Sequence, residues 1–154
     1  MKQNDCNKFK DRLVVECERL LEEKIALLDE ELKHLLEDIA EETKSSAGDK
    51  FETGREMMNA EQQTLLTQVE EFKKHLAILV SLPNPHHHQV DFGNLLNVGD
   101  KWIFIAVGLG IIKYDNQDIM VISPLAPLGK LFIGKTIGEQ VTFNGTSYTI
   151  KGIC

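Results

Sequence analysis

The chain has 154 residues, enough for one compact domain or for a small domain with a long appendage, and too few for catalytic folds whose cores need ~250 residues. Apolar residues make up 42% and charged residues 27%, so we expect a packed core rather than wholesale disorder. Residues 1–80 carry the whole net charge of −7, whereas residues 81–154 are neutral. Because neither half is basic, we expect contact with nucleic acid only through a protein partner.

Apolar residues from about residue 9 to residue 42 recur at alternating steps of three and four. This spacing is typical of a coiled-coil helix. The apolar seam consists of Val14, Leu21, Ile25, Leu28, Leu32, Leu35 and Ile39. The residues expected to widen this stripe are Leu13, Leu20, Leu27 and Leu36.

A second stretch, from about residue 56 to residue 82, repeats the pattern. Its seam consists of Met58, Gln62, Leu65, Val69, Phe72, Leu76 and Leu79. Two amphipathic helices of similar length joined by a short polar segment most simply fold back on each other. We therefore expect an antiparallel coiled-coil hairpin over residues 9–81, with its tip at residues 44–54.

Beyond the hairpin the pattern changes. Residues 82–89 include two prolines and are predicted to form a linker. Residues 90–154 are predicted to form a small, mostly antiparallel β domain, which makes the fold class α+β. Strands are expected near residues 90–96, 101–107, 118–122, 140–143 and 147–153, with a short helix at 125–132. Asn144-Gly145 is a strong hairpin signal.

The three cysteines Cys6, Cys17 and Cys154 are far apart and show no paired spacing. Reduced thiols in a cytoplasmic protein are the simplest interpretation. The longest apolar run, Trp102 to Ile112, is 11 residues long and too short to span a bilayer. The first residues lack the apolar segment of a secretory signal, so we expect no membrane association.

The predicted tip contains Gly48-Asp49-x-x-Glu52. In one interpretation Asp49 is the N-cap of the second helix and Glu52 completes a capping box. In the other, the two carboxylates face outward together and contribute to a Mg²⁺ site. Because Mg²⁺ takes six oxygen ligands, a partner would have to supply the others. Both interpretations can hold at once.

Residues 129–136, Gly129-Lys-Leu-Phe-Ile-Gly134-Lys-Thr136, match the phosphate-loop pattern. A phosphate loop follows a buried strand and opens a helix, whereas prolines precede this segment and bulky residues fill it. We therefore do not interpret it as a nucleotide site.

His86, His87 and His88 are adjacent in the predicted linker and have no cysteine or glutamate beside them. Imidazole is a common metal ligand. A structural or incidental role is nevertheless the better interpretation of such a run.

The order of hairpin, tip and β domain resembles the Gre transcript-cleavage factor family, whose members have an N-terminal coiled coil and a C-terminal FKBP-like domain. The stretch from Ile122 to Val141 carries the most specific resemblance, with Ser123-Pro124, Pro127-Leu128-Gly129-Lys130, Gly134-Lys135 and Gly138-Glu139. At the tip, residues 48–52 are similar to the family's Gly-Asp-Leu-Ser-Glu-Asn-Ala-Glu-Tyr loop.

The resemblance implies a transcription elongation factor that binds bacterial RNA polymerase in its secondary channel. Asp49 and Glu52 would help to hold a catalytic Mg²⁺ shared with the polymerase, which then cleaves backtracked RNA. The factor itself would be neither an enzyme nor a tight binder of any cofactor. The residues implied in docking are Ser123, Pro124, Pro127, Leu128, Gly129 and Lys130.

At the tip the chain departs from the family pattern, since Lys50 and Arg55 bring positive charge beside the acidic pair. We expect these two residues to modulate the tip. Three alternatives remain: a channel-binding regulator without cleavage activity, an FKBP-like peptidyl-prolyl isomerase, and a coiled-coil adaptor whose tip is only a turn.

Overall fold

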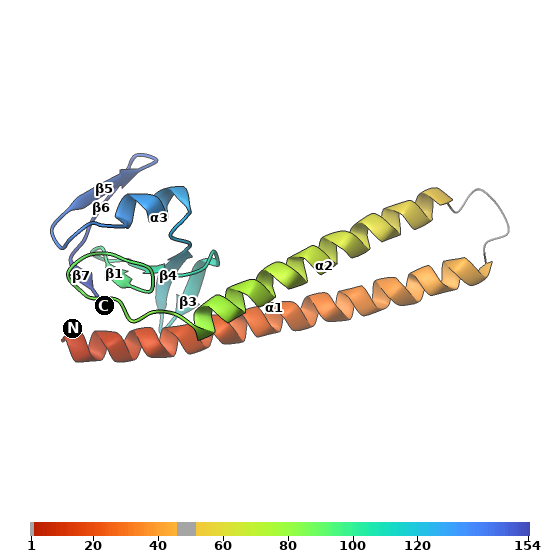
Figure 1. Cartoon of the computed structure of the whole chain (residues 1–154), viewed down its shortest axis with the longest axis horizontal. Coiled ribbons are helices and arrows are strands. Elements are labelled where there is room, and N and C mark those ends of the chain that lie inside the picture. Colours follow the sequence, from red (N-terminus) through yellow and green to blue (C-terminus); the bar gives the residue numbers. More distant parts are fainter. Residues whose placement is uncertain (1, 46–51) are drawn as a thin grey trace. The chain divides into compact units, whose positions relative to one another are not determined.

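The computed structural model describes residues 2–45 and 52–154 (Figure 1). Contacts between residues divide the chain into two compact units. One is made of Met1–Glu18 with Ala77–Cys154, and the other of Arg19–Leu76. The boundaries predicted at residues 81 and 90 stay a prediction. The helices are α1 (Gln3–Ser45), α2 (Glu52–Val80) and α3 (Pro127–Phe132). The strands are β1 (Leu95–Asn97), β2 (Trp102–Ile105), β3 (Gly110–Tyr114), β4 (Gln117–Ile122), β5 (Gln140–Phe143), β6 (Thr146–Thr149) and β7 (Gly152–Ile153).

The unit Arg19–Leu76 consists of parts of α1 and α2, which lie side by side and run antiparallel. Two cross-arm contacts fix this direction. The Nη2 atom of Arg55 lies 3.1 Å from the Oγ1 atom of Thr43, and the Lys24 ammonium lies 5.8 Å from the ring centroid of Phe72. An antiparallel helical hairpin is therefore confirmed for Arg19–Leu76, whereas residues 9–18 and 77–81 of the predicted range belong to the other unit.

The predicted seam is the part of this unit that is shielded from water. Leu21, Leu35, Leu65 and Val69 are buried, and the other seam residues between positions 21 and 76 are half-buried. The prediction that Leu27 and Leu36 widen the stripe is wrong, because their side chains are 62% and 45% exposed. A pair of helices can cover only a narrow stripe, so residues one step off the seam stay in water.

The other unit is built around a five-stranded sheet with the order β3-β4-β2-β1-β7. β2 and β4 pair in parallel, and the remaining neighbours pair antiparallel. β5 and β6 form a separate antiparallel hairpin. This is the small, mostly antiparallel β domain expected from the sequence.

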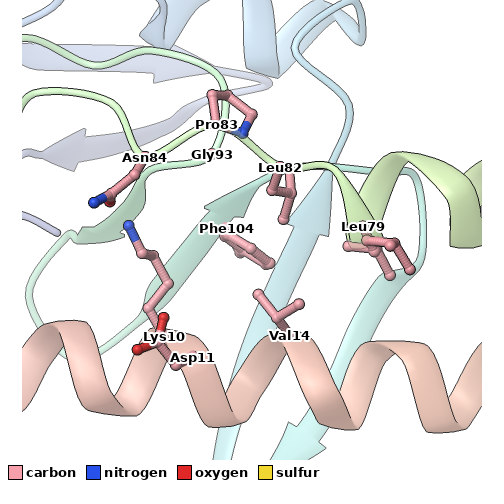
Figure 2. Close-up of a pocket in the computed structure, with 10 residues that line it drawn as sticks. Lys10, Asp11, Val14, Leu79, Leu82, Pro83, Asn84, Gly93 and Phe104 are labelled. Carbon is pink, nitrogen blue, oxygen red and sulfur yellow. The ribbon is translucent and has the colours of Figure 1, made fainter.

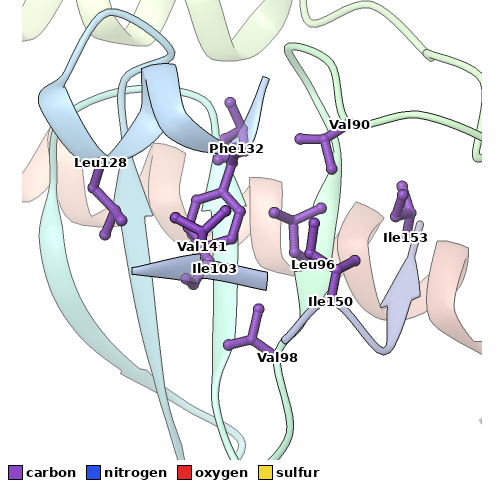
Figure 3. Packing of buried hydrophobic residues seen from close by; sticks show 10 residues of the cluster. Val90, Leu96, Val98, Ile103, Leu128, Phe132, Val141, Ile150 and Ile153 are labelled. Atoms are coloured by element: carbon purple, nitrogen blue, oxygen red, sulfur yellow. The ribbon is translucent and has the colours of Figure 1, made fainter. Parts of the chain in front are cut away.

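One face of the five-stranded sheet is covered by α3 and the β5–β6 hairpin (Figure 3). Ile103 and Ile105 of β2 point to this side and pack with Phe132 of α3 and Val141 of β5. The ring of Phe132 meets that of Tyr148 edge-on, with centroids 6.0 Å apart. This cluster is the main core of the unit.

The opposite face of the sheet is covered by the first turns of α1. Side chains alternate along a strand, so Trp102 and Phe104 point away from the main core. The Phe9 ring lies 5.7 Å from that of Trp102 and 5.5 Å from that of Tyr114. The buried stripe of α1 on this side consists of Cys6, Phe9, Lys10, Leu13 and Cys17. Burial on both faces explains why β2 is apolar at every position.

The prediction of three reduced thiols is wrong for two of them. Cys6 and Cys154 form a disulfide, with their Cα atoms 5.9 Å apart, although 148 residues separate them in sequence. The pair forms because β7 lies beside β1 and the first turn of α1 packs on the same sheet. Cys17 is a free thiol, and burial raises its pKa to about 12, so it is unreactive at neutral pH.

The strand predictions need three corrections. Residues 110–114 form β3, which was not predicted, and β3 turns into β4 through Asp115 and Asn116, both with positive φ. The single strand expected at 147–153 is two strands, β6 and β7, in different sheets. Only the end of the strand expected at 90–96 is extended. The Asn144-Gly145 turn is confirmed, with φ values of 48° and 78°.

Of the helices in residues 2–45 and 52–154, none combines the length and the apolar character needed to cross a membrane.

Candidate functional site

The predicted tip lies between the two arms of the hairpin. α1 ends at Ser45 and α2 begins at Glu52. Asp49 and Lys50 lie outside the described residues, and for Glu52 the structure describes the backbone only. Whether Asp49 caps α2, and whether the two carboxylates lie together, therefore stay predictions.

Arg55, expected to modulate the acidic pair, ties the two arms together. Its guanidinium donates to the hydroxyl of Thr43 on α1, and this hydroxyl donates in turn to the carbonyl of Ile39, 2.8 Å away. The Thr43 oxygen thus accepts one hydrogen bond and donates another. The Arg55 side chain thus contacts α1 across the arms, and its effect on the acidic pair stays a prediction.

The predicted docking segment forms a turn that leads into α3. The hydroxyl of Ser123 accepts from the backbone N–H of Leu125, and the Ser123 carbonyl accepts from the N–H of Ala126, both at 3.1 Å. Pro127 then occupies the first turn of α3, where its missing N–H costs no hydrogen bond. Ser123 and Pro124 are half-buried and act in this turn.

The residues of α3 separate into buried and exposed positions. Leu128 belongs to the main core, and Gly129 is buried against the Ser123 carbonyl, where a Cβ atom would overlap it. These two residues have a packing role here. Pro127 and Lys130 are exposed, and the neighbouring Leu125 is 77% exposed. The exposed surface of the segment is therefore smaller than the predicted set, and its docking role stays a prediction.

The phosphate-loop match adopts a different local structure. Its first four residues lie inside α3, so no loop follows a strand there. The Lys135 ammonium lies 3.2 Å from a carboxylate oxygen of Glu139, and the Thr136 N–H donates to that carboxylate at 2.6 Å. These bonds, the Thr136 one first, lower the pKa of Glu139. The lysine and threonine of the pattern are thus paired within the chain.

The histidine run is mostly in water, since His86 and His88 are exposed and His87 is half-buried. Burial, and then the nearby Lys10 charge, lower the pKa of His87. In the part of the chain that the structure describes, no three His, Cys, Asp or Glu side chains are grouped as a metal site.

A hollow of about 150 Å³ lies at the edge of the main core. Trp102, Ile103, Met120 and Tyr148 contribute to its lining, and Ile111 lies at its exposed side. This hollow was not predicted from the sequence, because its residues come from separate strands whose pairing is long-range. Lys101 and Asp118 also line this hollow. Its aromatic wall is the Tyr148 ring, because the Trp102 ring packs on Phe9 at the other face of β2. A partly apolar hollow with an aromatic wall is a feature that a proline-binding activity would need.

The sequence matches no protein-family model and no curated protein. Among solved structures, the GreA factor homolog 1 (Gfh1) protein of Thermus thermophilus is similar at 16% identity and a TM-score of 0.36, over 89% of this chain and 94% of that chain. Gfh1 of Thermus aquaticus is similar at 17% identity and a TM-score of 0.35, over 88% of this chain and 92% of that one. Likeness at this level carries no argument about function.

Proposed function

We propose that this chain is an accessory factor of bacterial RNA polymerase, of the Gre kind, and not an enzyme on its own. The observation that carries the proposal is the place of the Gly48–Glu52 motif in the chain. In the sequence, Asp49 follows Ser45, the last residue of α1, and Glu52 is the first residue of α2. The resemblance of residues 122–141 to the same family supports the proposal from a separate part of the sequence.

The length of the hairpin's helical arms follows from the helical rise. At 1.5 Å per residue, the part of α1 from Arg19 to Ser45 is about 40 Å long. The cross-arm bond between Arg55 and Thr43 stiffens the arms next to the turn. Since the residues up to position 80 carry the negative charge, the arms would avoid bare RNA and reach the active centre through contacts with the polymerase.

Asp49 and Glu52 supply carboxylate oxygens, the ligand type that Mg²⁺ prefers, but they are fewer than its six positions. The chemistry of this donor set fits a Mg²⁺ ion shared with the polymerase. When bound there, the ion would orient a water and neutralise charge at the RNA phosphate. The role of the two carboxylates is to hold and position, and the polymerase performs the cleavage.

For docking, we propose the exposed surface formed by Leu125, Pro127 and Lys130. Exposed apolar residues next to a fixed turn are suited to contact with another protein. Leu125→Ser should weaken polymerase binding at least about tenfold if Leu125 is an anchor. Leu131→Ser, at the 42% exposed leucine of α3, is the matched control. Equal affinities of the two variants would remove this surface from the proposal.

The deciding experiment adds the full chain to stalled, backtracked elongation complexes and follows the length of the RNA. Asp49→Asn and Glu52→Gln preserve capping but remove charged metal ligands, so each should slow cleavage at least about tenfold. Glu56→Gln, one turn along α2, controls for loss of negative charge. Binding with inhibited elongation and no cleavage would select the non-cleaving regulator. Absence of polymerase binding would overturn the proposal.

The isomerase alternative has one observation in its favour, the hollow next to Tyr148. A peptide assay of proline isomerisation tests it directly. Activity that Tyr148→Ala abolishes, with the fold intact, would make the chain an enzyme. No acceleration over the uncatalysed rate would leave the hollow without this role.

A further inference from the structure

A second cavity, of about 210 Å³, lies where α1, the end of α2 and the following linker meet β2 (Figure 2). All of its lining residues belong to the unit of Met1–Glu18 with Ala77–Cys154. Val14, Leu79, Leu82 and Phe104 make its walls apolar. Gly93, with a φ of +92°, also lines the cavity and lies so close to the linker that a Cβ atom there would overlap the Pro83 carbonyl.

Lys10 is the unusual residue of this cavity. It is only 6% exposed, and its Nζ atom is buried without a hydrogen bond to any residue that the structure describes. Figure 2 shows the amine directed away from α1 toward Asn84 and the linker. A buried ammonium without a partner is strongly unfavourable, so a bound acceptor would relieve a real cost. Burial lowers the pKa of Lys10, and the nearby Asp11 carboxylate opposes this.

The surroundings of the amine define the acceptor. Lys10 and Asn84 are the two lining side chains that can donate a hydrogen bond, whereas a phosphate needs several donors to replace its water. The Asp11 carboxylate also lines the cavity and would repel a doubly charged anion more than a singly charged one. A monocarboxylate with a short apolar body fits both the Lys10 amine and the apolar part of the lining.

We propose that this cavity binds a small monocarboxylate, whose oxygens accept from the Lys10 ammonium and whose apolar body lies against the half-buried Val14 and Leu82. The inference does not depend on the proposed role in transcription. Trp102, the one tryptophan of the chain, lies on the same face of β2 as Phe104 and can report on binding.

The test titrates the full chain with hexanoate at constant ionic strength, using calorimetry and Trp102 fluorescence. Hexanamide is the matched neutral probe, and inorganic phosphate is the dianion probe. We expect hexanoate to bind and to raise the melting temperature. Hexanamide and phosphate should bind at least about tenfold more weakly, because a charge-assisted bond and its complementary charge are lost.

Lys10→Met keeps the length of the side chain and removes its charge. We expect it to weaken hexanoate binding at least about tenfold without lowering the melting temperature of the free chain. Lys8→Met, at an exposed position of the same helix, should bind as the wild type does. Undetectable hexanoate binding, equal binding of hexanamide, or unchanged binding in Lys10→Met would overturn the proposal. If Lys10→Met does not fold, the acid and amide comparison on the wild-type chain decides.

Discussion

The two compact units of this chain differ in the interactions that stabilise each of them internally. The unit Arg19–Leu76 has one apolar seam between two helices, and residues one step away, such as Leu27, are in water. The other unit buries a sheet on both faces and closes it with a disulfide. Local periodicity is enough to specify the first kind of structure, whereas the second depends on contacts between distant parts of the sequence. Substitutions should therefore change the stability of one unit more than that of the other.

The largest effect is expected where the first turns of α1 cover the sheet. Leu13 is fully buried there, and Leu13→Asp would place an unpaired charge in the core, at a cost of about 4 kcal/mol. Denaturant unfolding followed by Trp102 fluorescence should show the loss. Val15→Asp, at a position that is 64% exposed, is the control. Similar midpoints for the two variants would mean that α1 does not cover this face.

The next largest effect is expected from the disulfide. Reduction should lower the stability of the sheet unit by about 3 kcal/mol, because the open chain gains freedom when it unfolds. The Trp102 transition should move, while the helical signal of the Arg19–Leu76 unit should change less. In Cys6→Ser the reductant should have no effect. A reductant effect of equal size in that variant would exclude the Cys6–Cys154 bond as its source.

A smaller effect is expected in the helical seam. Leu65 is 6% exposed, and Leu65→Ala should cost about 2 kcal/mol, the low end for a buried leucine, because a thin seam can partly collapse. Circular dichroism at the helical band should detect it, with the Trp102 signal little changed. Leu66→Ala, at a position that is 38% exposed, should cost much less. A larger loss of stability in Leu66→Ala than in Leu65→Ala would mean that the apolar seam does not lie on the Leu65 face of α2.

The smallest effect is expected at the cross-arm bond. Thr43→Val removes the acceptor of the Arg55 guanidinium, and for an exposed bond this should cost about 0.5 kcal/mol or less. Amide hydrogen exchange near Ile39 should become faster. Thr64→Val is a close control, because the Thr64 hydroxyl bonds only to the Ala60 carbonyl of its own helix in the described structure. Equal changes in both variants would show that the bond across the arms adds nothing.

The sequence predicted the elements whose signals are local. The seam from Leu21 to Leu76 follows from spacing, and the turn at Asn144-Gly145 follows from two residues that tolerate positive φ. The short helix was also found from local signals, although the match to a phosphate loop overlaps it. β3 was missed because it is an edge strand with exposed residues such as Ile111, and it has little apolar alternation.

The site needed information that spacing does not contain. The stripe Cys6, Phe9, Leu13 and Cys17 has helical spacing, but nothing local shows that a sheet lies against it rather than the second arm. The local sequence around Lys10 is that of an exposed lysine, and its burial depends on the linker residues that line the same cavity. Leu128 and Gly129 read as docking residues by resemblance, and their burial depends on how α3 packs on the sheet. In each case the missing information is tertiary.

The bond between Cys6 and Cys154 has a consequence for the covalent connectivity of the molecule. It converts almost the entire polypeptide into a ring, since 148 positions separate the two cysteines. A single cut by a protease between them would release no fragment, so the nicked molecule would keep its mass on a nonreducing gel and separate into pieces only after reduction.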